Sequence, residues 1–97
     1  MAMNYLKHIR EIILHALEHE DVSVALFASH VHGTAGRASD VDVAIIPRGN
    51  MDPSRLSLLR DELEESNIPY KVEVVDFSLV NRSFREFALQ GAQWWRQ

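Results

Sequence analysis

Apolar residues recur at helical spacing near the start of the chain. Over residues 3–20, Leu6, Ile9, Ile13 and Leu17 stand three or four positions apart, so they fall on one face of a helix. Charged residues and histidines occupy many of the remaining positions. This pattern predicts an amphipathic helix that packs one side against a core.

Two further helices are predicted from the residues that start them. Asp52 is a favourable N-cap and Pro53 suits the first helical position, and a leucine stripe follows that should end before Pro69. Later in the chain, Ser83 and Glu86 have the spacing of a capping box. The helix that they open should turn three apolar side chains inward: Phe84, Phe87 and Ala88.

Three segments instead have a period near two and are predicted to be strands: residues 22–29, 40–46 and 70–77. The first is apolar on both faces, which is typical of a central strand covered on both sides. In the second, Val41, Val43 and Ile45 form an apolar face. The resulting order α-β-β-α-β-α predicts an α/β (α+β) fold, in which a small mixed sheet packs against helices.

The length and composition narrow the class of protein. A chain of 97 residues favours one domain over residues 1–97, and a formal net charge of −4 argues against non-specific binding to nucleic acid. The absence of cysteine excludes disulfides and thiolate metal sites. No apolar run approaches the roughly 20 residues of a membrane span, and the start of the chain lacks the apolar core of a signal peptide. We therefore expect a cytoplasmic protein.

Two carboxylates stand close together in the second predicted strand. Residues i and i+2 of a strand share a face, so Asp40 and Asp42 should lie on one side, roughly 7 Å apart along the strand. Two carboxylates on a core strand repel each other and are costly to desolvate unless something pairs with them. A divalent cation such as Mg²⁺ solves both problems, since it binds carboxylates together with water and substrate phosphates. The alternative is that this Asp-x-Asp pair is only a solvated strand edge.

A third carboxylate would complete such a site, and the third predicted strand offers two of opposite parity, Glu73 and Asp76. Because Val74 should face the helices, Glu73 should lie on the other face of the sheet. If the strands are neighbours, Glu73 then joins Asp40 and Asp42. Asp76, at the end of the strand, is the weaker candidate.

The segment around the two aspartates resembles a known motif. A strand ends in Ala28-Ser29, a loop follows that contains Gly33, and Ser39 then precedes Asp40 and Asp42. This arrangement resembles the minimal nucleotidyltransferase (MNT) family of the DNA polymerase β-like nucleotidyltransferase superfamily, whose motif is Gly-Ser, a loop of similar length and Asp-x-Asp. The likeness covers nearly the whole chain, since the leading helix, the VEVVDFS strand and the closing FREFALQGAQWW segment fall where the family has equivalent elements.

The resemblance implies a nucleotidyltransferase-like fold and the transfer of a nucleoside monophosphate, AMP from ATP in the simplest case, to an acceptor hydroxyl with release of pyrophosphate. It implies that Asp40, Asp42 and Glu73 are catalytic and hold Mg²⁺, with Mn²⁺ as an alternative. Glu73 would also accept the proton of the acceptor. The residues implied to bind the nucleotide lie at the strand end and in the loop: Ala28, Ser29, Gly33 and Ser39.

The resemblance also implies a protein partner. In this family the partner is commonly a separate helical protein of the HEPN type, and the two can form a toxin–antitoxin system in which the transferase is the antitoxin. The C-terminal aromatic segment with Trp94 and Trp95 offers a second contact, by docking on a partner or by self-association, because aromatic residues favour interfaces. One of the two tryptophans is expected to cover the core instead. No direct contact with nucleic acid or membrane is expected.

Departures from the motif leave a second function open. The motif's glycine is Ala28 here, and two positions that are usually arginine are His30 and His32, which are mostly neutral at pH 7 and attract phosphate less. The alternative is therefore a catalytically weak or inactive nucleotidyltransferase-fold binding module that neutralises a partner protein. A third possibility is an unrelated small α+β protein, which a fold without convergence of the three carboxylates would favour.

The histidines have two alternative interpretations. His30 and His32, near Asp40 and Asp42, are candidates for a Zn²⁺ or Mn²⁺ site, or are simply exposed residues of a polar loop. Three more are expected to lie on the solvated face of the first helix: His8, His15 and His19.

Overall fold

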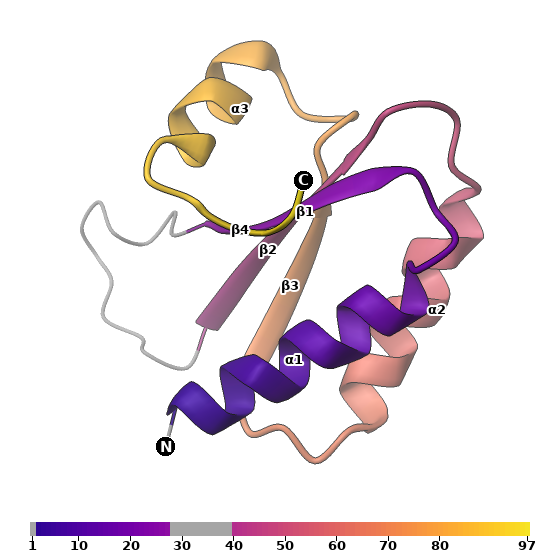
Figure 1. Ribbon diagram of the computed structural model, residues 1–97, viewed down its shortest axis with the longest axis vertical. Coiled ribbons are helices and arrows are strands. Elements are labelled where there is room, and N and C mark those ends of the chain that lie inside the picture. Colours follow the sequence, from indigo (N-terminus) through magenta and orange to yellow (C-terminus); the bar gives the residue numbers. More distant parts are fainter. Residues whose placement is uncertain (1, 28–39) are drawn as a thin grey trace.

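The computed structural model describes residues 2–27 and 40–97, which form three helices and a mixed four-stranded sheet (Figure 1). The strand order is β3-β2-β1-β4, with β2 and β3 parallel and with β1 antiparallel to both β2 and β4. The fold class predicted from the sequence is therefore confirmed. In chain order the elements are α1 (Ala2–Ala16), β1 (Val22–Phe27), β2 (Asp40–Pro47), α2 (Pro53–Glu65), β3 (Lys71–Asp76), α3 (Arg82–Leu89) and β4 (Gln93–Arg96).

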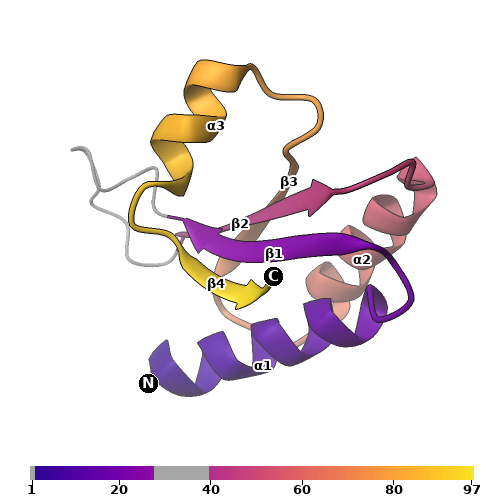
Figure 2. The ribbon, with the colours of Figure 1, turned by 45° about the horizontal axis from the view of Figure 1, so that its top comes forward.

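The sheet has a helical layer on each face. Figure 2 shows α1 and α2 on one side of the strands and α3 on the other. The larger core lies between the sheet and the first two helices, and its buried residues are Ile9, Ile13, Leu17, Val22, Val24, Val41, Val43, Ile45, Leu56, Leu59, Leu63, Val74 and Trp95. The smaller core lies beneath α3, and its buried residues are Ala25, Phe27, Ala44, Ile46, Phe77 and Ala88. The alternation along each strand thus separates the two cores, as the period-two pattern predicts.

The first helix ends earlier than the sequence predicts, at Ala16 instead of residue 20. Beyond this point the chain forms a tighter turn, in which the amide of Glu20 donates to the carbonyl oxygen of Leu17, three residues earlier, at 3.0 Å. Arg96 also donates from Nη1 to the carbonyl oxygen of Leu17 and from Nη2 to that of Glu20, each at 2.9 Å. A side chain distant in sequence therefore satisfies carbonyls that another helical turn would otherwise have used.

The second helix begins as predicted. The Asp52 side chain accepts a hydrogen bond from the backbone amide of Ser54 at 3.0 Å, and Pro53 occupies the first helical position. The third helix begins differently, because its N-cap is Asn81, whose Oδ1 accepts from the amide of Phe84 at 2.7 Å. The predicted capping box at Ser83 is therefore wrong: Asn81 stands two positions earlier and makes the cap itself.

The tail forms a fourth strand, which the sequence analysis did not predict. β4 pairs with β1 over a bulge, with Trp94 opposite Ala25. Trp95 is buried in the core beneath α1, which meets the expectation that one tryptophan covers the core, whereas Trp94 is 38% exposed. Of the three residues predicted to face inward from α3, only Ala88 is buried; Phe84 and Phe87 remain partly exposed.

None of the helices in the described part of the chain is long and apolar enough to cross a bilayer.

Candidate active site

Two of the predicted site residues meet on neighbouring strands. Asp42 of β2 and Glu73 of β3 are register partners in the parallel ladder, so their Cα atoms stand side by side on strands about 4.8 Å apart. Their immediate neighbours in the same register, Val43 and Val74, belong to the core beneath α1 and α2. Asp42 and Glu73 therefore both project from the opposite face of the sheet, the face that α3 covers.

Asp40 begins β2 two residues before Asp42, and its register partner is Lys71. Its backbone thus continues the same row of positions, while its side chain lies outside the part of the structure that is described. Also outside the described residues are the predicted nucleotide-binding residues and the two loop histidines: Ala28, Ser29, Gly33, Ser39, His30 and His32.

Glu73 lies on the open side of the pair. Its side chain is 56% exposed, and the Lys71 ammonium approaches its carboxylate, with 3.8 Å between Nζ and Oε1. On the other side of Asp42, the register partner on β1 is Phe27, which is 3% exposed. The pair therefore has a solvent-accessible carboxylate at one end and an apolar wall at the other.

Aromatic packing holds that wall in place. The ring of Phe27 makes edge-to-face contacts with Phe77 and Phe84, at centroid distances of 5.2 and 6.3 Å. Phe84 belongs to α3, and Phe77 follows directly after β3. The wall beside Asp42 is thus built from three separate segments of the chain.

The second candidate on β3, Asp76, has a structural role. Its Oδ1 accepts hydrogen bonds from the backbone amide and the hydroxyl of Ser78, at 2.9 and 2.6 Å, which closes the turn after the strand. Its position also has the opposite parity to Glu73, as the sequence predicts. Asp76 therefore does not share the face on which Asp42 and Glu73 lie.

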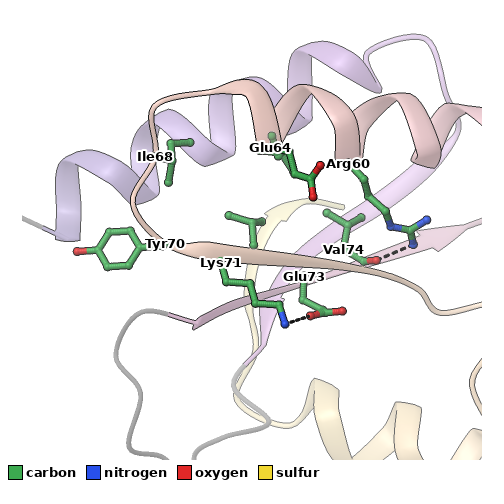
Figure 3. A pocket seen from close by; sticks show the side chains of 9 residues that line it. Arg60, Glu64, Ile68, Tyr70, Lys71, Glu73 and Val74 are labelled. Atoms are coloured by element: carbon green, nitrogen blue, oxygen red, sulfur yellow. Dashed lines mark hydrogen bonds and ion pairs between the residues drawn. The ribbon is translucent and has the colours of Figure 1, made fainter.

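A groove runs along the outer edge of β3, beneath α2, and Glu73 and Lys71 form part of its lining (Figure 3). It encloses about 380 Å³. On its α2 side, Nη2 of Arg60 donates to the carbonyl oxygen of Val74 at 2.8 Å. Arg60 thereby covers an edge carbonyl of the sheet.

The donor set fits a hard divalent cation. Asp42 and Glu73 offer carboxylate oxygens from adjacent positions on one face, and Mg²⁺ is commonly held by one or two carboxylates with the remaining positions left to water and phosphate. Within residues 2–27 and 40–97, no group of three histidine, aspartate or glutamate side chains is arranged to hold a metal. The side chain of Asp40, the third ligand expected from the sequence, lies outside the described residues.

The histidines of the first helix are solvated, as expected. His15 and His19 are 80% and 89% exposed, and each has its Nε2 near Oε2 of Glu18, at 3.9 and 3.6 Å. His19 lies beyond the end of the helix. This exposed cluster contains one carboxylate, that of Glu18, and not a pair of carboxylates on neighbouring strands.

The sequence analysis did not identify Lys71 as a site residue. The signal was present in the sequence, since a lysine two positions before Glu73 in a strand must share its face. Only the register of β2 against β3 shows that Lys71 also stands beside Asp40.

Comparisons with known proteins agree with this geometry. Residues 8–93 match the family described as Polymerase beta, Nucleotidyltransferase. Over 66 residues the chain is 35% identical to a probable protein adenylyltransferase, MntA, of Haemophilus influenzae; the match covers 68% of this chain and 58% of the relative. The chain thus spans less than two thirds of the length of this relative.

Two solved structures share the fold. One is a crystal structure of a mutant MntA–HpeT toxin–antitoxin, with a TM-score of 0.62 and 19% identity. The other is a crystal structure of the toxin–antitoxin with AMP-PNP, with a TM-score of 0.62 and 21% identity. In both cases the match covers 89% of this chain and 71% of the other. Since the family match extends over most of the sequence and includes both Asp42 and Glu73, the chain belongs to the polymerase β nucleotidyltransferase family.

Proposed function

We propose that this chain is a metal-dependent nucleotidyltransferase that moves AMP from ATP to a hydroxyl group on a partner protein. The observation that carries the proposal is the side-by-side position of Asp42 and Glu73 in a member of this family. The MntA relative, a probable protein adenylyltransferase, supports AMP as the transferred group and a protein as the acceptor. The similar fold determined with AMP-PNP, an analogue of ATP, supports ATP as the donor.

In this proposal Asp40, Asp42 and Glu73 hold Mg²⁺, with Mn²⁺ as an alternative. When bound, the ion supplies positive charge next to the phosphate oxygens and orients the reacting groups. One of the similar structures carries two Asp→Glu exchanges separated by a single residue, which is the spacing of Asp40 and Asp42. That correspondence supports the choice of these two aspartates.

Glu73 is suited to the proton transfer. Glu73 is exposed whereas Asp42 is half-buried. The carboxylate of Glu73 accepts the proton of the acceptor hydroxyl while the hydroxyl oxygen bonds to the α-phosphorus. The bond between the α-phosphorus and the oxygen that bridges to the β-phosphate breaks, and pyrophosphate leaves with the electron pair of that bond. Ala28, Ser29, Gly33 and Ser39 are proposed to bind the nucleotide through the loop between β1 and β2, where backbone amides suit an anion.

The proposed partner is a helical toxin of the HEPN type, which makes this chain the antitoxin of the pair. Two structures with this fold are toxin–antitoxin assemblies, which supports a protein partner. The proposed docking surface is formed by the partly exposed aromatic residues of α3 and β4: Phe84, Phe87 and Trp94.

The second candidate function is a binding module that neutralises the same partner without catalysis. It is favoured by three departures from the family motif: Ala28, His30 and His32. The two candidates differ in whether the acidic pair matters. A module needs only its docking surface, whereas an enzyme needs the carboxylates.

The test is a label-transfer assay. The protein is incubated with Mg²⁺, ATP labelled at the α-phosphate, and the product of the neighbouring gene as acceptor. We expect label on the acceptor, and Asp42→Asn should reduce the rate more than about 100-fold, because even indirect supports of a metal site cost 10–100-fold. The matched control is Asp61→Asn, which alters an exposed aspartate of α2. Neutralisation of the partner that persists in Asp42→Asn without any label transfer would favour the binding module.

A further inference from the structure

Lys71 forms an ion pair with one of the two described carboxylates, that of Glu73. Its Nζ lies 3.8 Å from Oε1 of Glu73, and Figure 3 shows the ammonium reaching along the strand to that carboxylate. Through the register of β3 with β2, Lys71 stands directly beside Asp40, just as Glu73 stands beside Asp42. Lys71 is thus one of four neighbouring positions on two strands, and the other three are acidic: Asp40, Asp42 and Glu73.

A second cation of the groove, Arg60, already has a hydrogen-bond partner on the backbone. Arg60 is hydrogen-bonded to the Val74 carbonyl at 2.8 Å, at the outer edge of the sheet. By contrast, the side chain of Lys71 is 75% exposed, and within residues 2–27 and 40–97 the interaction it makes is the ion pair with Glu73. Leaving Glu73 therefore costs Lys71 an exposed ion pair.

An exposed ion pair of this kind contributes little to folding, because water and salt screen it and two long side chains lose freedom. It has a larger consequence for what binds at the site. A divalent cation that takes Glu73 as a ligand must displace the ammonium, and it must also enter against the repulsion of a positive charge within a few ångströms. Lys71 stands beside Asp40, where β2 begins after the loop that is proposed to bind the nucleotide, so the polyphosphate is the anion to which the displaced ammonium would transfer.

We infer that Lys71 is the exchangeable counter-ion of this site: it neutralises Glu73 when no divalent ion is bound and transfers to the polyphosphate when the metal–nucleotide complex binds. The inference rests on the proposed function, because it takes the same carboxylates as metal ligands. It adds a residue to which that function assigns no role. Lys71 acts through the charge balance of the site, so it is a positioning residue for the metal and the nucleotide.

The inference predicts effects of opposite sign on two ligands. Removing the ammonium in Lys71→Met should tighten the binding of Mn²⁺ alone, by about two- to five-fold at low ionic strength, which matches the strength of an exposed charge pair. The same substitution should weaken the binding of a fluorescent ATP analogue with Mg²⁺ by a similar factor, because the polyphosphate loses a cation. A general disturbance of β3 would weaken both ligands together.

The experiment titrates the purified full chain with Mn²⁺, following free Mn²⁺ by electron paramagnetic resonance, and with the fluorescent ATP analogue and Mg²⁺, following anisotropy. Lys7→Met is the matched control, since Lys7 is the other lysine of the chain and is exposed on α1. Lys71→Arg should keep both affinities near those of the unsubstituted protein. In 0.5 M salt the gain in Mn²⁺ affinity should shrink, because screening then acts over about 4 Å.

Weaker or unchanged Mn²⁺ binding in Lys71→Met, or an equal gain in Lys7→Met, would overturn the inference. Absence of Mn²⁺ binding by the unsubstituted protein would overturn both this inference and the metal dependence of the proposed function. The two proposals fail separately in other respects. If no label is transferred but Lys71→Met still changes the Mn²⁺ and nucleotide affinities in opposite directions, only the proposed enzymatic activity is refuted. If label is transferred but Lys71→Met leaves both affinities unchanged, only the counter-ion role of Lys71 is refuted.

Discussion

Asp42 of β2 and Glu73 of β3 are register partners on adjacent parallel strands, although the whole of α2 lies between them in the sequence. A helix between two strands returns the chain in the same direction, so β2-α2-β3 places two strand positions side by side that no local turn could join. The acidic pair is therefore a product of the crossover connection.

Glu73→Gln tests the proposed proton acceptor. The amide keeps the shape of the side chain but has no carboxylate to accept the proton, so the rate of label transfer should fall about 10²–10⁴-fold. Binding of the fluorescent ATP analogue should change much less, which separates a loss of kcat from a loss of affinity. Glu65→Gln, at the exposed end of α2, is the control. Equal rates for Glu73→Gln and the unsubstituted protein would exclude Glu73 from the chemistry.

Arg96→Met tests how the end of α1 is held. The substitution removes two charge-assisted hydrogen bonds, to the carbonyls of Leu17 and Glu20, and leaves two acceptors without these partners. The free energy of unfolding in urea should fall by about 2–3 kcal/mol. Arg82→Met, which removes an exposed ion pair with Glu86, should cost less than about 0.5 kcal/mol. Similar losses in the two variants would show that the contacts of Arg96 contribute no more than a surface pair.

Asn81→Ala tests which residue caps α3. Because Oδ1 of Asn81 accepts the amide hydrogen of Phe84, the variant should lose about 1 kcal/mol of folding stability in a urea titration. Ser83→Ala, inside the helix, should change stability by less than about 0.5 kcal/mol. A larger loss of stability in Ser83→Ala than in Asn81→Ala would instead support the capping box at Ser83 that the sequence pattern favours.

The cap of α2 gives a dependence on pH. The backbone hydrogen bond from Ser54, with its hydroxyl and Arg55 as further causes, lowers the pKa of Asp52 below its ordinary value of 3.8. A carboxyl whose pKa is lowered by folding stabilises the folded state fully above its unfolded pKa, and this contribution disappears as the pH falls through the folded pKa. The difference in unfolding free energy between the unsubstituted protein and Asp52→Asn should thus be constant above pH 5. Below pH 4 the unsubstituted protein should lose stability relative to Asp52→Asn. A difference that is independent of pH would contradict this account of the cap.

Local patterns predicted much of the fold. The period of two in β1, β2 and β3 separates the two cores correctly, and it places Glu73 on the face opposite Val74. The start of α2 follows from Asp52 and Pro53 because an N-cap is a local hydrogen bond. These features depend on residues that are close together in the sequence.

The features that the sequence did not predict depend on distant partners. β4 has only four residues, and it is a strand because β1 offers it an open edge. The early end of α1 depends on Arg96, which is far along the chain. Asn81 and Ser83 are both acceptable caps by residue type, and the course of the turn after Asp76 decides between them. The role of Lys71 depends on the register between two strands, which a single-strand pattern does not contain.

The central claim is that the carboxylates of β2 and β3 hold a divalent ion against a bound nucleotide. The most direct measurement is the anomalous signal of Mn²⁺ in a crystal grown with a non-hydrolysable ATP analogue. We predict a peak about 2.1 Å from carboxylate oxygens of both Asp42 and Glu73, in contact with the phosphates of the analogue. A well-ordered analogue with no Mn²⁺ peak at these two side chains would contradict the claim.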